Sequence, residues 1–153
     1  GDGTERARAQ QRTRNEHMTN VQFEDFVDPS EYPALVKEVD CGLVCLGARN
    51  RTPTVPGKIW GFMAAGLPIL ALLNIQNEGI QILRDAACGY ACPSDDLDAA
   101  ERLTRKLYAD RATLRTLGQA GRAYAAQHYA KRTCIDQLER LLVCAPDRVP
   151  ATV

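Results

Sequence analysis

The sequence predicts an α/β fold: a Rossmann-like parallel sheet with helices on both faces, followed by a helical C-terminal part. Short apolar segments alternate with segments that repeat apolar residues at helical spacing, as in a parallel sheet crossed by helices. Apolar segments such as CGLVCL at 41–46 lack polar alternation, which is typical of strands buried on both faces. We assign residues 1–143 to one such domain and 144–153 to an irregular tail.

The N-terminal elements carry the weakest signals. Thr4 suits the N-cap of a basic helix that runs to about residue 14 and has only alanines as an apolar stripe. Residues 21–23 are a strand candidate. Asp28 or Ser30 then caps a second helix, before the strand at 41–46. That helix places four apolar side chains at i, i+3, i+4 and i+7: Tyr32, Leu35, Val36 and Val39.

The later elements alternate more regularly. We expect strands at 67–73 and 90–92, and a helix after each of them. Two more helices follow, at about 111–127 and 131–143, and Gly118 and Gly121 are expected to break or bend the first. The second carries several apolar side chains: Ile135, Leu138, Leu141 and Leu142.

Composition limits the possible partners. Lys+Arg and Asp+Glu both number 19, so the net charge gives no case for nucleic acid or an acidic partner. No apolar run approaches the roughly 18 residues that a spanning helix needs, and the start has no signal-peptide pattern. The chain begins at Gly1 without an initiator Met, so we expect it to be part of a longer protein.

The cysteines are expected to be structural thiols, because Cys packs well as a small buried hydrophobe. Their two C-x3-C pairs differ from the C-x2-C pairs of common zinc sites, so a metal or disulfide framework is the lesser alternative. Free thiols suit a reducing compartment, and we expect a cytoplasmic protein. The six are Cys41, Cys45, Cys88, Cys92, Cys134 and Cys144.

The segment TPTVPGKIWGFMAAGLPILALL, residues 52–73, is the strongest candidate for a functional site. It predicts a loop that enters a helix at Pro56, Gly57 and Lys58, and Gly66 ends that helix. A helix N-terminus presents free N–H groups and partial positive charge, so it suits a phosphate. A cation such as Lys58 in the first turn opposes the helix dipole unless an anion is bound nearby. The simpler alternative is a solvated lysine.

The predicted topology supports this position. In open α/β sheets, ligands bind at the carboxyl ends of the strands. The loops at 47–57 and 74–79 both follow predicted strands, and the first is long for a compact domain.

Six segments in order resemble the C-terminal domain of GT-B glycosyltransferases. They are GDGTERARAQ, NVQFEDFV, SEYPALVKEVDCGLVCL, VPGKIWGFMAAGLPILA, AACGYACPSDD and LGQAGRAYAAQHY. The chain is most similar to retaining family 4, in the branch that builds bacterial exopolysaccharides and capsules. The resemblance covers residues 1 to about 142.

The resemblance implies a nucleotide-sugar donor site whose diphosphate rests against loop-to-helix junctions. It implies no metal and no cofactor, with the nucleotide-sugar as substrate. The acceptor, a saccharide or a lipid-linked sugar, would bind an N-terminal domain that this chain lacks, and that domain would attach loosely to the inner membrane face. The expected nucleobase region contains Phe23, Glu24 and Phe26. The expected phosphate region contains Val55, Pro56, Gly57, Lys58, Ile59, Asn77, Glu78 and Gly79, with Thr52 and Thr54 as hydroxyl donors.

Two departures from the family pattern matter. The glutamate that usually holds the donor ribose is Gly61 here, and its partner eight residues earlier is Pro53. The PGK turn at 56–58 fits the exopolysaccharide branch, which often relaxes that glutamate. The family also has two strands before GDG, and without them the strand at 41–46 would be an exposed edge.

Three hypotheses about function follow. The first is the donor-binding part of a glycosyltransferase in polysaccharide biosynthesis, not expected to be active without its acceptor domain. The second is a non-catalytic module that binds a nucleotide or nucleotide-sugar. The third, a nucleotide-sugar epimerase on the same fold, would need acidic and histidine side chains around the cleft. The two histidines, His17 and His128, are expected in outer helical parts.

Overall fold

The computed structural model describes residues 3–50 and 54–143. The chain divides into two compact units, Gly1–Glu38 and Val39–Val153. The predicted tail at 144–153 lies outside the described residues, as do Thr52 and Pro53.

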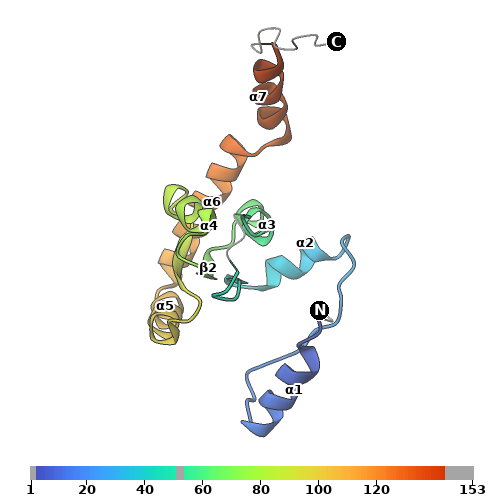
Figure 1. Ribbon diagram of the computed structural model, residues 1–153, viewed down its shortest axis with the longest axis vertical. Coiled ribbons are helices and arrows are strands. Elements are labelled where there is room, and N and C mark those ends of the chain that lie inside the picture. The colour runs from blue at the N-terminus through green and yellow to red at the C-terminus, as the bar shows by residue number, and fades with distance from the viewer. Residues whose placement is uncertain (1–2, 51–53, 144–153) are drawn as a thin grey trace, which may run out of the picture. The chain divides into compact units, whose positions relative to one another are not determined.

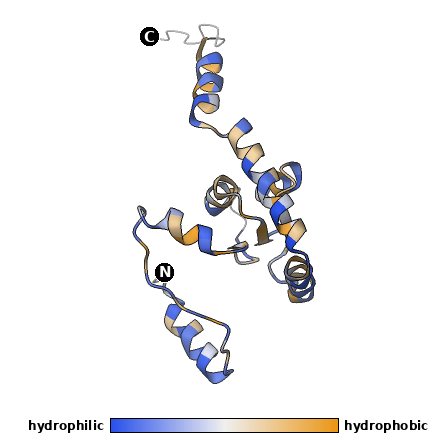
Figure 2. Cartoon of the chain, turned by 180° about the vertical axis from the view of Figure 1, so that it is seen from behind, coloured by the Kyte–Doolittle hydropathy of each residue, from blue (hydrophilic) through white to orange (hydrophobic). Residues whose placement is uncertain are grey.

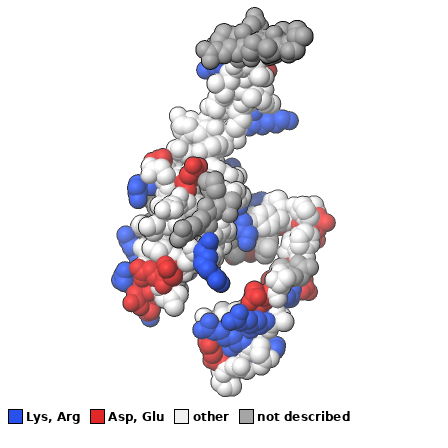
Figure 3. Space-filling view, in the orientation of Figure 1, with Lys and Arg blue, Asp and Glu red and all other residues white. Residues whose placement is uncertain are grey.

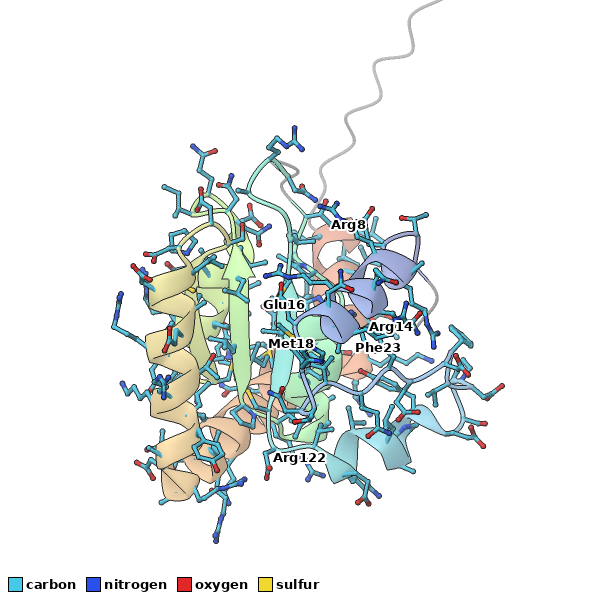
Figure 4. The ribbon with its side chains drawn as sticks, turned by 90° about the horizontal axis from the view of Figure 1, so that it is seen from below. Arg8, Arg14, Glu16, Met18, Phe23 and Arg122 are labelled. Carbon is cyan, nitrogen blue, oxygen red and sulfur yellow. The ribbon has the colours of Figure 1, made fainter. Side chains whose placement is uncertain are left out.

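The first unit contains α1 (Arg6–Asn15), a short α2 (Tyr32–Leu35) and a 3-10 turn (Val36–Glu38). The arginines of α1 form a basic surface in Figure 3, and Arg8 and Arg14 project from it in Figure 4. Helix α1 begins after Glu5, so the prediction of Thr4 as its N-cap is wrong.

The strand expected at 21–23 is absent, because a three-residue segment needs a neighbouring strand to pair with and none lies in the described part of this unit. The helix expected from about residue 30 is also shorter than predicted. After Leu35 it tightens into the 3-10 turn, and only Val36 among its four apolar side chains is buried.

The second unit contains a parallel sheet of β1 (Gly42–Cys45), β2 (Ile69–Leu73) and β3 (Gly89–Pro93), in that spatial order. Leu72 pairs with Cys45 on one side and with Cys92 on the other. The Rossmann-like parallel architecture predicted from the sequence is therefore confirmed.

The helices of this unit follow the predicted order. They are α3 (Lys58–Ala65), α4 (Glu78–Asp85), α5 (Leu97–Ala109), α6 (Arg111–His128) and α7 (Lys131–Val143), shown in Figure 1. Gly66 ends α3 with a left-handed φ of 74°, as the sequence predicts.

Helices cover the two faces of the sheet unequally. On one face, α3 and α4 bury Val44, Ile69, Ala71 and Leu73. Figure 2 shows hydrophobic colour on the strands at the centre of this unit. On the other face, Leu107 of α5 and Leu114 of α6 cover Leu70 of β2. Figure 4 shows the strands side by side with α5 beyond β3.

β1 is one of the two edge strands and is covered on one face only. Its second face carries Leu43 and Cys45, and Leu43 is 53% exposed. The prediction of a strand buried on both faces is therefore wrong, because α5 and α6 lie over β2 and β3. The predicted exposed edge is confirmed.

Two glycines of α6 hold helices close together. Gly118 faces the backbone of Gly66, and Gly121 faces Cys88 and Met63. The helix runs unbroken through both positions, so a break is wrong, and the alternative prediction of a bend stays a prediction. Here glycine serves close packing between α6 and the end of α3.

The thiols do not share one environment. Cys88 and Cys92 are buried, as expected for structural cysteines, while Cys45 and Cys134 are exposed. Cys134 lies on α7, whose apolar side chains Ile135, Leu138, Leu141 and Leu142 are also exposed. Cys144 lies outside the described residues.

Candidate functional site

The junction between β1 and α3 presents an uncapped helix start. Gly57 occupies the N-cap position and supplies no side-chain hydrogen bond, and the first turn contains no acidic residue. The backbone N–H of Ile59 donates to Pro56 O at 3.0 Å, which tightens the first turn. The first helical residue is Lys58, an exposed cation. This end of α3 therefore offers positive potential without an internal anion.

Lys58 lies near the carboxyl end of β1. Partial burial raises the pKa of the Cys45 thiol, and the nearby Lys58 ammonium opposes that shift. Among the described residues, no carboxylate lies within 4.0 Å of the Lys58 ammonium. Its charge is thus free to act on a bound anion.

The junction between β2 and α4 is capped. The side-chain Oδ1 of Asn77 accepts a hydrogen bond from the Gly79 N–H at 2.9 Å, and Glu78 lies exposed in the first turn. This is the ordinary arrangement of a helix N-terminus. α5 and α6 begin in the same way, with caps from Asp96 and Asp110.

The two junctions lie side by side. A Cβ placed on Gly79 would be 2.9 Å from Cδ1 of Ile59, so the first turns of α4 and α3 touch. The Asn77 Nδ2 also donates to Thr54 O at 3.2 Å, across the space between the loops. Parallel topology brings both loops to one edge of the sheet, where such folds bind ligands.

The predicted phosphate residues divide by exposure. Thr54, Gly57, Lys58 and Glu78 are exposed, and Val55 and Pro56 are partly buried. Three others form the support beneath them: Ile59, Asn77 and Gly79. Thr52 lies outside the described residues.

The predicted nucleobase residues lie in the first unit. Phe23 is partly buried, Glu24 receives a hydrogen bond from Gln22 Nε2, and Phe26 is 72% exposed. They occupy an extended segment, and Phe23 is labelled in Figure 4. Their nucleobase role stays a prediction.

Three further residues near this edge were missed from the sequence. Asn74 Nδ2 donates to Ala48 O at 3.0 Å and so fixes the start of the β1–α3 loop. Cys45 was treated only as a structural thiol, although it lies within electrostatic reach of Lys58. Ser94 follows β3, and its buried hydroxyl has no hydrogen-bond partner among the described residues. A polar residue just after a buried strand is the signal that could have identified Asn74 and Ser94 from the sequence.

A cavity at the opposite edge of the sheet offers different chemistry. It measures about 230 Å³ and is lined chiefly by apolar side chains, including Leu70, Leu107 and Leu114. The cation at its rim, Arg111, is already paired with Asp40 at 2.6 Å. This cavity is poorly suited to a diphosphate.

Metal and membrane signals are lacking in the described residues. No group of three or more His, Cys, Asp or Glu side chains there could hold a metal ion. No helix in residues 3–50 and 54–143 combines the length and apolar character needed to cross a membrane.

The sheet and its helices form an α/β, Rossmann-like fold of the GT-B type. The solved structure of sucrose-phosphate synthase from Thermosynechococcus elongatus is similar to this chain, with a TM-score of 0.72 at 23% identity. The similarity covers 95% of this chain and 36% of that one. No protein-family model matches the sequence, and no match was found among curated proteins.

Proposed function

We propose that this chain is the donor-binding part of a glycosyltransferase that uses a nucleoside diphosphate sugar. The observation that carries the proposal is the pair of touching helix starts at the carboxyl ends of the strands, one of which carries Lys58, a cation without an ion-pair partner among the described residues. The uncapped first turn of α3, its Lys58 ammonium and the positive end of the adjoining α4 suit the two phosphates of a diphosphate.

In this proposal the chain acts on the leaving group. The bond from the sugar C1 to the diphosphate oxygen breaks, a bond from C1 to an acceptor hydroxyl forms, and that hydroxyl's proton passes to a base. Negative charge grows on the diphosphate as it departs. Lys58, the uncapped start of α3 and the positive end of the α4 dipole stabilise that charge, which lowers the barrier.

The finer assignments rest on the family resemblance. They are membership of family 4, the exopolysaccharide and capsule branch, a lipid-linked or saccharide acceptor held by another domain, and a reaction without a metal. Cytoplasmic location with peripheral attachment to the inner membrane face belongs to the same set.

The ribose contact would differ from the family pattern. Gly61 is exposed, and a Cβ added there would meet no heavy atom within 4 Å. The family's carboxylate can be installed as Gly61→Glu, because the Cβ of the new side chain has open space there. If the site is a donor site, we expect this variant to bind a nucleoside diphosphate at least as tightly as the wild type does.

Lys58→Ala tests the proposal. We expect affinity for the preferred member of UDP, GDP and ADP to fall by about 10- to 100-fold, because a charge-assisted contact of roughly 1.5–3 kcal/mol is lost. Calorimetric titration measures this. Stability should stay equal or rise by about 0.3–1 kcal/mol, since a cation leaves the positive end of a helix.

Lys131→Ala is the matched control, because Lys131 is the first residue of α7 as Lys58 is the first of α3. It should bind as the wild type does. Unchanged affinity in Lys58→Ala, or no binding of any of the three nucleotides by the wild type, would contradict the proposed site.

The second candidate is a module that binds the nucleotide-sugar without catalysis. The absence of a ribose-binding carboxylate at Gly61 favours it. The two candidates differ in one measurement, the transfer of labelled sugar to a lipid-linked acceptor by the full-length protein. Transfer supports the enzyme, while tight binding with no transfer supports the module.

A further inference from the structure

We infer that Asn77 is a positioning residue that joins the two helix starts into a single anion-binding surface. This inference rests on the proposed function, because it concerns the same site. Asn77 itself need not touch the ligand. Its role is to hold the start of α3, with Lys58, at a fixed place beside the start of α4.

Among the described residues, Asn77 is the polar residue that is buried as a whole, with 6% of its surface exposed. A buried amide costs free energy unless its donors and acceptor are paired. Its Oδ1 is paired with the Gly79 N–H at 2.9 Å and its Nδ2 with Thr54 O at 3.2 Å. One amide therefore makes two different contacts, one within α4 and one to the loop that leads into α3.

Capping alone does not explain an asparagine here. α5 and α6 are capped by Asp96 and Asp110, whose carboxylates accept hydrogen bonds and have no proton to donate. A carboxylate at position 77 would still cap α4, but it would face the Thr54 carbonyl oxygen without a hydrogen to share. The contact between the two loops therefore depends on the Nδ2 group of Asn77, which donates the hydrogen bond to Thr54 O.

The tether acts close to the proposed phosphate contacts. Thr54 precedes Pro56 by two residues, and Lys58 follows two residues later. The other end of the same loop is held by Asn74, which donates to Ala48 O at 3.0 Å. The turn between β2 and α4 thus forms hydrogen bonds with the β1–α3 loop at two places. The hydrogen bond from Asn77 is the one nearer in sequence to Lys58.

A fixed loop favours anion binding in a simple way. If the loop were loose, the ligand would have to order it on binding, and that entropy cost would weaken the affinity. With Asn77 in place, much of this ordering is done in the free protein. Loss of the tether should therefore weaken binding of phosphate-bearing ligands more than it lowers stability.

Asn77→Ser is the decisive variant. Serine caps a helix about as well as asparagine, so the contact within α4 is kept, while its short hydroxyl does not reach Thr54 O. It also adds no charge beside the anion site. Asn77→Ala removes both contacts and serves as the second variant. Asp110→Ala removes the cap of α6 at the opposite edge of the sheet and is the matched control for lost capping.

Two measurements are made on the full chain. Affinity for UDP, GDP and ADP is measured by calorimetric titration, and backbone hydrogen exchange is measured over residues 54–59 without ligand. For Asn77→Ser we expect about tenfold weaker binding of the preferred nucleotide, the equivalent of one lost hydrogen bond, and faster exchange confined to that loop. Asp110→Ala should lose stability and keep both its affinity and its loop exchange.

The outcomes separate the two proposals. If the wild type binds a nucleotide and Asn77→Ser binds it equally well, the inference about Asn77 is overturned and the donor site stands. Equal weakening in Asp110→Ala would also overturn it, since lost stability alone would then explain the effect. If the wild type binds none of the three, the proposed function fails and the inference falls with it.

Discussion

The two ends of α3 are built in opposite ways. At its C-terminal end, Gly66 turns with φ of 74° and α6 packs directly against it through Gly118. At its N-terminal end, Gly57 supplies no cap, and Lys58 is exposed beside a helix start that repels it. One end gains stability from close packing. The other leaves backbone donors and a cation open to solvent.

The difference separates what the fold needs from what a ligand would need. A helix can be ended tightly, and this chain caps α4, α5 and α6 with side chains in the usual way. The uncapped start of α3 costs some stability that a bound anion would restore. Substitutions at the packed end should therefore lower the stability of the fold. Substitutions at the N-terminal end should change nucleotide affinity and leave stability equal or higher.

The largest effect on stability is expected from Gly118→Ala, at the C-terminal end of α3, which α6 covers and which we call the closed end. A Cβ at Gly118 would lie 2.0 Å from the carbonyl oxygen of Gly66, so α6 must move away from α3. Alanine normally favours a helix over glycine, yet here we expect a loss of about 1–3 kcal/mol or more, because overpacking outweighs propensity. Urea denaturation measures the change. A neutral or stabilising result would show that α6 can shift freely and that the closed end is not tightly packed.

Cys88, which faces Gly121 at the closed end, should have a smaller effect, on how stability depends on pH. Burial raises the pKa of its thiol from 9.0 to about 11. Between pH 9 and 11 the unfolded state releases this proton first, so stability should fall as pH rises, by at most about 1.4 kcal/mol per pH unit. Below pH 9 the thiol is neutral in both states, and the effect should vanish.

Cys88→Ala should flatten this part of the pH dependence. Denaturation midpoints at pH 8, 9 and 10 provide the measurement. Burial also raises the pKa of Cys41, Cys45 and Cys92, so a residual slope of the same sign is expected. Identical slopes in the variant and the wild type would contradict the assignment to Cys88.

Local signals explain what the sequence predicted well. The apolar run of β2 and the glycine that ends α3 each act within a few residues, so their outcome could be predicted without knowing the fold. The same holds for Lys58 at a helix start. The parallel order of the strands then placed two loops at one edge.

Non-local packing explains what the sequence missed. Gly118 was expected to break or bend a helix because its partner, the backbone of Gly66, is 52 positions away in the chain. β1 was expected to be buried on both faces because the placement of α5 and α6 is not visible in its own residues. Likewise, the hydrogen bonds from Asn77 to Thr54 and from Asn74 to Ala48 span 23 and 26 residues. No local pattern predicts such pairs.

The smallest effect is expected from Gly61→Ala, which makes the same substitution on the open side of α3. Gly61 lies inside the helix and is exposed, and a Cβ there meets nothing within 4 Å. Helix propensity alone should decide the result, so we expect a gain of about 0.5–1 kcal/mol in urea denaturation. The opposite signs at Gly61 and Gly118 would show that α3 is closed on one side and open on the other. A loss at Gly61 would mean that an unseen neighbour packs against this side of the helix, in which case the start of α3 would not be open to a nucleotide.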